Sequence, residues 1–81
     1  MNESAVLKRL QSIFQDVFGD ENLKISSDSS ADNIPAWDSL MQILILQAVQ
    51  DEFGSEFSVD EVSQIKTVGD IINAVLEKNN G

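Results

Sequence analysis

The side chains able to do chemistry in this sequence are of few kinds, and most of them are carboxylates and serine hydroxyls. The 81 residues include no histidine and no cysteine, and tyrosine is also absent. A serine nucleophile needs an adjacent base, usually histidine, to accept its proton, and thiolate chemistry needs cysteine. We therefore expect that the chain is not an enzyme, and that any reaction at one of its serines is performed by another protein.

One serine stands where its surroundings favour modification. Asp38 and Ser39 follow a long polar segment and precede an apolar one, so Asp38 is expected to cap a helix and Ser39 to hold its first position. The free backbone N–H groups and the positive end of the helix dipole would accommodate a phosphate ester there. The same pair is also ordinary capping chemistry, and the two residues alone favour that simpler interpretation.

The elements that must position Ser39 are all predicted to be helical. Apolar residues recur at spacings of three and four, with capping residues at the ends, and no alternating strand pattern or repeat appears. The predicted helices run from 4 to 18, from 39 to 53, from just after Ser58 and from just after Thr67, with Gly19 and Gly54 ending the first two. We predict an all-α fold, a small four-helix bundle with three longer helices and one short, and a single domain over residues 1–81.

A long loop is predicted between the first two helices. Residues 19–37 are crowded with Asp, Asn and Ser, and a flexible linker is one interpretation of the serine-rich part. Apolar residues near both ends argue instead for a loop pinned to the core. These anchors are Leu23, Ile25, Ile34 and Trp37.

The second predicted helix carries more apolar surface than one buried face needs. Its side suited to burial is formed by Ile45, Leu46, Val49 and Phe53. Leu40, Met41 and Leu44 point elsewhere, in company with Gln47 and Asp51. Such a helix either lies centrally in the bundle or uses its second face for a partner.

The order of several motifs resembles one family. Asp38-Ser39-Leu40 matches the Asp-Ser-Leu signature of acyl carrier proteins. The agreement continues through Asp51-Glu52-Phe53-Gly54, Phe57, Asp60-Glu61-Val62 and Thr67-Val68-Gly69-Asp70. The chain is similar to the discrete members of that family over nearly its whole length, and Trp37 resembles the variant encoded beside specialised biosynthetic enzymes.

The resemblance implies a cofactor and a set of partners. A phosphopantetheinyl transferase would use Mg²⁺ to attach 4′-phosphopantetheine from coenzyme A to Ser39. The thiol of that arm would hold an acyl intermediate as a thioester for the acyl-loading and acyl-processing enzymes of fatty acid or polyketide biosynthesis. Asp38 is expected to orient the transferase and Leu40 to fill a pocket on it. Val62 and Ile65 match positions that line an acyl groove in the family, and an ordinary core role for both is equally open.

The second helix departs from the family pattern. Where familiar fatty-acid carriers bear acidic residues on its exposed side, this sequence has Met41, Gln42, Leu44 and Gln47. We therefore expect partners to recognise Met41, Leu44 and Gln47 mainly through apolar contacts, with charge providing longer-range steering. Burial of Met41 and Leu44 beneath the loop is the alternative.

Charge and hydropathy argue against two classes of partner, nucleic acids and membranes. A net charge of −9 repels nucleic acid and anionic membranes, and the longest apolar run, Ile43–Leu46, is too short to span a bilayer. The N-terminus has no apolar stretch of signal-peptide type. We expect a cytoplasmic monomer, with no nucleic-acid partner, no membrane insertion and no metal site.

Other functions stay open at this stage. A peptidyl or D-alanyl carrier would use identical attachment chemistry, although aspartate rather than histidine before the serine favours acyl cargo. An unmodified helical interaction domain is a second alternative. A calcium-binding module is a third, since Asp28, Ser30 and Asp32 match the first, third and fifth positions of an EF-hand loop. Asn33 and Ser39 then stand where glycine and glutamate are expected.

Overall fold

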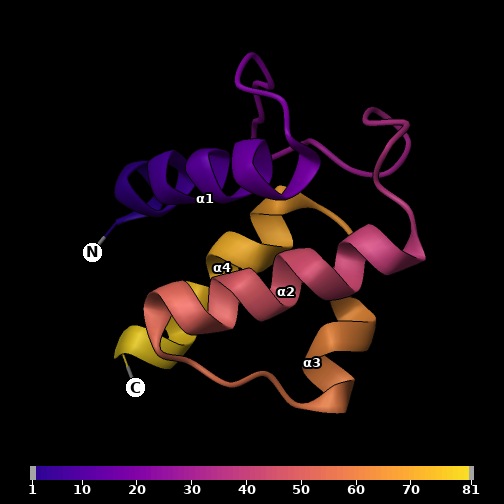
Figure 1. Ribbon diagram of the computed structural model, residues 1–81. Coiled ribbons are helices and arrows are strands. Elements are labelled where there is room, and N and C mark those ends of the chain that lie inside the picture. The colour runs from indigo at the N-terminus through magenta and orange to yellow at the C-terminus, as the bar shows by residue number, and fades with distance from the viewer. Residues whose placement is uncertain (1, 81) are drawn as a thin grey trace.

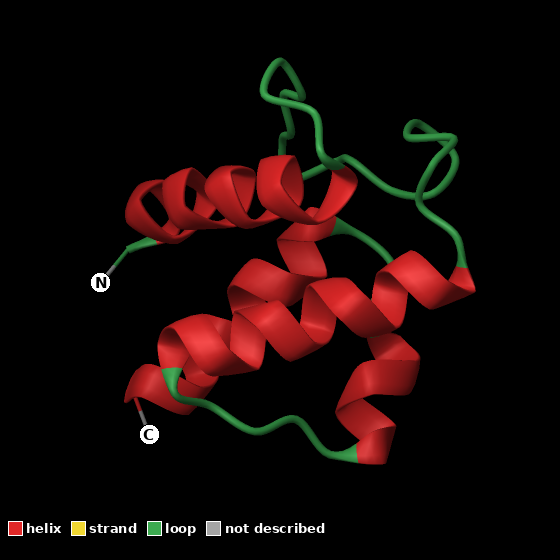
Figure 2. Cartoon of the chain, viewed as in Figure 1, coloured by secondary structure: helices red, strands yellow, loops and turns green. Residues whose placement is uncertain are grey.

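Four helices and their connections make up the protein in a computed structural model that describes residues 2–80 (Figure 1). The helices are α1 (Glu3–Phe18), α2 (Ser39–Phe53), α3 (Val59–Gln64) and α4 (Val68–Asn80). No strand occurs within the described range, which Figure 2 shows as helices joined by loops. The predicted all-α fold with three longer helices and one short helix is confirmed, and the bounds of α2 agree with the prediction.

The helix ends form where the capping residues predict them. The side chains of Asn2, Asp38 and Ser58 each accept a backbone N–H from the first turn of the helix that follows. Gly19 and Gly54 follow α1 and α2 with φ of 65° at both positions, a conformation that other residues adopt only at a cost. These local signals fix where each helix begins and ends.

The buried side chains form one cluster shared by the three longer helices and the loop. α1 packs against both α2 and α4, and α1 and α2 run in opposite directions (Figure 1). The cluster contains Val6, Leu10, Ile13, Phe14, Ile25, Ile34, Trp37, Ile45, Leu46, Val49, Phe53, Ile65, Val68, Ile71, Ile72 and Val75. None of the helices in the described residues has the length and apolar character that crossing a membrane requires.

The long loop is bound to α1 by side chains and by aromatic packing. Gln11 Oε1 accepts the N–H of Ile25 at 3.1 Å, and the ring of Phe14 meets the indole of Trp37 edge-on with 5.2 Å between centroids. Ile25, Ile34 and Trp37 are buried and Leu23 is half-buried, so all four predicted anchors contact the core. The flexible-linker interpretation of the serine-rich part of this loop is therefore wrong, and Ser29 within it is itself buried.

The same loop is bound to the start of α4 through backbone groups. The N–H groups of Val68 and Gly69 donate to the carbonyls of Ser29 and Ser27, both at 2.9 Å. A Cβ at position 69 would lie 3.0 Å from the Ser27 carbonyl oxygen, so the close approach favours glycine. Because the loop rests on both α1 and α4, the point at which it enters α2 is held in place.

Candidate functional site

Ser39 is the first residue of α2, and its side chain is exposed. Asp38 Oδ1 accepts the N–H of Met41 and the Asp38 carbonyl accepts the N–H of Gln42, both at 2.9 Å. The N–H groups of Ser39 and Leu40 have no partner within the helix, and the Ser39 hydroxyl makes no hydrogen bond to the described residues. The hydroxyl is thus accessible and lies beside two unpaired donors at the positive end of the helix dipole.

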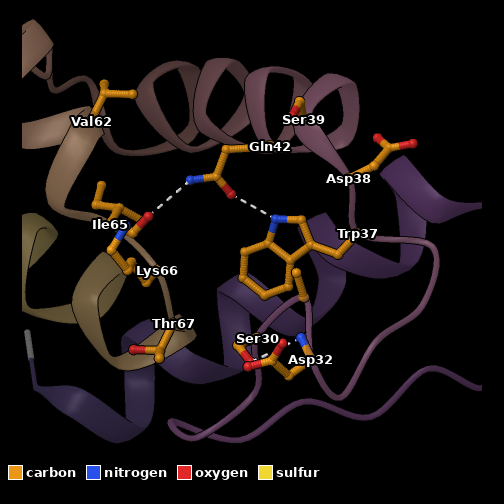
Figure 3. A pocket seen from close by; sticks show the side chains of 11 residues that line it. Ser30, Asp32, Trp37, Asp38, Ser39, Gln42, Val62, Ile65, Lys66 and Thr67 are labelled. Atoms are coloured by element: carbon orange, nitrogen blue, oxygen red, sulfur yellow. Dashed lines mark hydrogen bonds between the residues drawn. The ribbon is translucent and has the colours of Figure 1, made fainter.

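An open pocket of about 690 Å³ lies beside Ser39 (Figure 3). Its walls come from the loop, the start of α2, α3 and the connection between α3 and α4. The apolar part is formed by Trp37, Val62 and Ile65, and the polar part includes Ser30, Lys66 and Thr67. Val62 and Ile65 thus line a pocket next to Ser39, and Ile65 is at the same time a buried core residue. That this pocket holds an acyl chain stays a prediction.

Gln42 connects two walls of this pocket. The indole N–H of Trp37 donates to Gln42 Oε1 at 2.6 Å, and Gln42 Nε2 donates to the carbonyl of Ile65 at 3.3 Å (Figure 3). The prediction that Gln42 lies on the exposed side of the second helix is wrong, because its side chain points inward and is half-buried.

An apolar stripe runs along the outside of α2. Leu40, Ile43 and Leu44 are 63%, 65% and 46% exposed, and Gln47 is exposed one turn further on. We call these four residues the exposed α2 face; they follow the spacing i, i+3, i+4, i+7. Burial of Leu44 beneath the loop is therefore wrong. Ile43 was not among the predicted recognition residues, although its spacing from Leu40 and Gln47 could have identified it.

The other predicted recognition residues, Met41, Gln47 and Asp38, differ in how far they are exposed. Met41 is half-buried and packs against the core, so it belongs partly to each of the two interpretations. Gln47 donates from Nε2 to Asp51 Oδ1 at 3.4 Å, which holds both polar groups at the far end of the exposed α2 face. Asp38 is exposed beside Ser39 even though one of its oxygens caps the helix.

Two carboxylates hold the wall opposite α2. Asp70 Oδ2 accepts the N–H groups of Lys66 at 2.9 Å and Thr67 at 3.1 Å, and these hydrogen bonds, the first above all, lower the pKa of Asp70. Glu61 accepts the N–H of Ser58 at 2.8 Å and pairs with Lys78 at 3.0 Å, which lowers the pKa of Glu61 in the same way. Asp70 therefore fixes the backbone of Lys66 and Thr67, which line the pocket, while Glu61 joins α3 to α4.

The acidic loop is organised as a turn. The Ser30 hydroxyl donates to Asn33 Oδ1 at 3.1 Å and accepts the N–H of Asp32 at 3.2 Å. Within residues 2–80, no three acidic, histidine or cysteine side chains are grouped as a metal site would require. The Ser30 hydroxyl, one of the ligands in the calcium-site alternative, is thus engaged in the turn itself.

A small helical protein that lacks histidine and cysteine, and that offers one free serine at a helix N-terminus beside a pocket, has the features of a carrier. A sequence model of the family described as phosphopantetheine attachment site matches residues 8–75. The chain belongs to the acyl carrier protein family, as its motifs suggest.

Known members of the family are similar over nearly their whole length. An acyl carrier protein from Thermosynechococcus vestitus is 30% identical over 79 residues, covering 96% of each chain. One from Coprothermobacter proteolyticus is 32% identical over 79 residues, covering 98% of this chain and 95% of its own. The solution structure of a holo acyl carrier protein from Geobacter metallireducens superposes with a TM-score of 0.85 at 31% identity, covering 93% of this chain and 86% of that one.

The fold is shared more widely than the sequence. The acyl carrier protein of Thermotoga maritima reaches the same TM-score, 0.85, at 21% identity, covering 99% of this chain and 93% of its own.

The family assignment confirms two predictions: the protein is a carrier and not an enzyme, and its cofactor is phosphopantetheine. The residues present fit that group, because a free, exposed serine hydroxyl adjoins a pocket with both polar and apolar walls.

Proposed function

We propose that this protein holds an acyl intermediate as a thioester on 4′-phosphopantetheine attached to Ser39, and presents it to biosynthetic enzymes. The observation that carries the proposal is the exposed, unbonded hydroxyl of Ser39 in the first turn of α2, beside the pocket. When bound, the cofactor supplies the thiol that a chain without cysteine lacks.

The surroundings of Ser39 support a role for its two neighbours in modification. The Asp38 carboxylate remains exposed beside the hydroxyl, so a phosphopantetheinyl transferase and its Mg²⁺ can reach it. Leu40 projects into solvent from the same turn, which suits insertion into an apolar pocket on the transferase. Both residues therefore act as recognition residues for the modifying enzyme.

The exposed α2 face serves the enzymes that load and process the acyl group. Its three large apolar side chains offer anchors that gain from leaving water, while the net charge of −9 draws basic partner surfaces from a distance. Apolar contact sets the strength of binding and charge sets the rate of encounter. Acyl-loading and acyl-processing enzymes with an apolar pocket rimmed by basic residues are the expected partners.

Intact-protein mass spectrometry tests the attachment. The protein is incubated with coenzyme A, Mg²⁺ and a broad-specificity phosphopantetheinyl transferase, beside Ser39→Ala and the control Ser4→Ala, which removes an exposed serine from the first turn of α1. The native chain and the control should gain one phosphopantetheine, and Ser39→Ala should gain none. A gain on Ser39→Ala would refute the assignment. A folded native chain left unmodified, even by the transferase of its own host, would favour an unmodified interaction domain.

A further inference from the structure

Gln42 is placed to control what enters the pocket beside Ser39. It lies three residues after Ser39, so the two side chains share a side of α2. Its amide spans the space between Trp37 and Ile65, with hydrogen bonds of 2.6 and 3.3 Å at its two ends (Figure 3). A polar link thus crosses an otherwise apolar part of the pocket.

Both partners of Gln42 depend on it. Trp37 is 4% exposed and Ile65 is 6% exposed, and Ile65 is the C-cap that follows α3, where backbone carbonyls lack partners within the helix. The indole N–H can only donate and the carbonyl can only accept, so the amide has one workable orientation. Displacing Gln42 would remove the partner of a donor and of an acceptor in a partly buried setting, which carries a cost.

The chemistry of an acyl chain decides whether it can replace those bonds. A saturated chain has neither donor nor acceptor, so entry between Trp37 and Ile65 would leave both groups unpaired. A keto or hydroxyl oxygen can instead accept a hydrogen bond. The second N–H of Gln42 Nε2 has no acceptor among the described residues and is available for such an oxygen.

We propose that Gln42 is a specificity-determining residue of this carrier. Its link between Trp37 and Ile65 excludes saturated acyl chains from the pocket beside Ser39 and favours short acyl groups that bear an oxygen near the thioester. The proposal rests on attachment of the cofactor to Ser39. It predicts that the polarity of one side chain, rather than the volume of the pocket, selects the cargo.

The test compares two cargoes of equal length on three proteins. Native protein, Gln42→Met and the control Gln64→Met receive acyl-phosphopantetheine from octanoyl- and 3-oxooctanoyl-coenzyme A through a broad-specificity phosphopantetheinyl transferase, and mass spectrometry first establishes loading. Gln64→Met makes the same change at an exposed position of α3 that does not line this pocket. The readouts are the NMR signals of the Trp37 indole N–H, the only indole in the chain, and of the Val62 and Ile65 methyl groups.

In the native protein and in Gln64→Met, the octanoyl form should leave these signals where they are in the unacylated form, and the 3-oxooctanoyl form should shift the indole signal. In Gln42→Met, the octanoyl form should shift the Val62 and Ile65 methyl signals and hydrolyse several-fold more slowly. Failure to load would count against attachment at Ser39 and not against Gln42.

Two results would overturn the proposal. The first is an octanoyl form of the native protein that already shifts the Val62 and Ile65 methyl signals, because the pocket would then admit a saturated chain with Gln42 present. The second is a 3-oxooctanoyl form that leaves the indole signal unmoved. Both are measured on the native protein, so the test holds even where Gln42→Met fails to fold.

Discussion

Asp38 caps α2 and, under the proposed function, also takes part in recognition by the transferase, and substitution can separate the two. One oxygen accepts the N–H of Met41 and so caps α2, while the carboxylate as a whole stays exposed beside Ser39. Asparagine can make the same capping bond without the charge, and alanine can make neither contribution. The pair of substitutions therefore distinguishes the hydrogen bond from the charge.

We expect Asp38→Ala to lower the free energy of unfolding by about 1 kcal/mol, and Asp38→Asn to change it by only a few tenths. Both should slow phosphopantetheinylation, because both remove the negative charge. Urea unfolding and the rate of mass gain with a transferase measure the two effects. If Asp38→Asn were modified at the native rate, the charge would have no part in recognition.

At single residues, prediction from sequence succeeded where the signal is local. The Asp38–Ser39 junction needs only its neighbours to be recognised as a helix start. The role of Gln42 was not predictable in this way, because its acceptor Ile65 lies 23 residues further along the chain. The sequence pattern could not show whether Gln42 would face solvent or bridge two buried groups, since that depends on how α3 ends beside α2.

Among the elements, α2 has one buried face and one exposed face. Ile45, Leu46, Val49 and Phe53 are buried as predicted, and the exposed α2 face remains free for partners. A substitution on the second face should therefore affect binding without affecting the fold. Leu44 is the sharper probe, because Met41 packs partly against the core.

Leu44→Glu should unfold at nearly the native temperature and should lower the kcat/KM of an acyl-loading enzyme by about tenfold, the loss expected for an interface anchor. Val59→Glu is the matched control, because Val59 is 85% exposed on α3 and lies outside the exposed α2 face. Circular dichroism and steady-state kinetics provide the measurements. Equal kinetic losses in both variants would indicate a general effect of charge.

α3 and α4 are joined by a connection that Asp70 stabilises from the start of α4. Since the pKa of Asp70 is lowered from its ordinary value of 3.8, the stabilisation is complete above that pH and is lost as the pH falls below it. The native protein should exceed Asp70→Asn in stability by a constant amount from pH 7 to about pH 4, and the difference should shrink at lower pH.

Urea unfolding across this pH range measures the difference for Asp70. Asp28→Asn serves as the control, because the Asp28 side chain makes no hydrogen bond to the described residues. Comparing each variant with the native protein at the same pH cancels the titration of the other groups. Because both variants remove one carboxylate, the difference between them cancels the effect of the lost charge. A difference that stayed constant down to pH 2 would contradict the assigned role of Asp70.

The elements were largely predictable because their ends carry strong local signals, such as the Ser58–Glu61 capping box. Which of their apolar residues would be exposed was less predictable. Ile43 and Val59 are apolar residues that face solvent, and exposure depends on whether another segment happens to cover a side chain. Periodicity identifies which residues share a face but not which face stays uncovered.

For the whole molecule, the dominant electrostatic feature is an excess of negative charge. The sequence has fourteen acidic and five basic residues. Two ion pairs, Arg9–Glu52 and Lys78–Glu61, occur in the described range. The molecule measures 33 × 25 × 21 Å, and the Debye length at about 0.01 M salt is roughly 30 Å, so like charges on all sides repel one another.

The melting temperature should therefore rise as sodium chloride is increased from about 0.01 M to about 0.15 M, where the Debye length shortens to roughly 8 Å. Potassium chloride should give the same rise, because screening depends on ionic strength. A fall would mean that the two ion pairs outweigh the repulsion. If calcium chloride is added instead, a rise that saturates at micromolar calcium would indicate a specific calcium site.

The single-domain assignment for residues 1–81 stays a prediction.

The bonds from the loop to α4 have a further consequence, for the exchange of amide protons with solvent. Amide protons in the first turn of a helix usually exchange fast, because they have no partner. Here the amides of Val68 and Gly69 are covered by the carbonyls of Ser29 and Ser27, so they exchange only when the loop lifts away. Their exchange rates would report how often the segment that leads to Ser39 opens, at positions 29 and 30 residues removed from the serine itself.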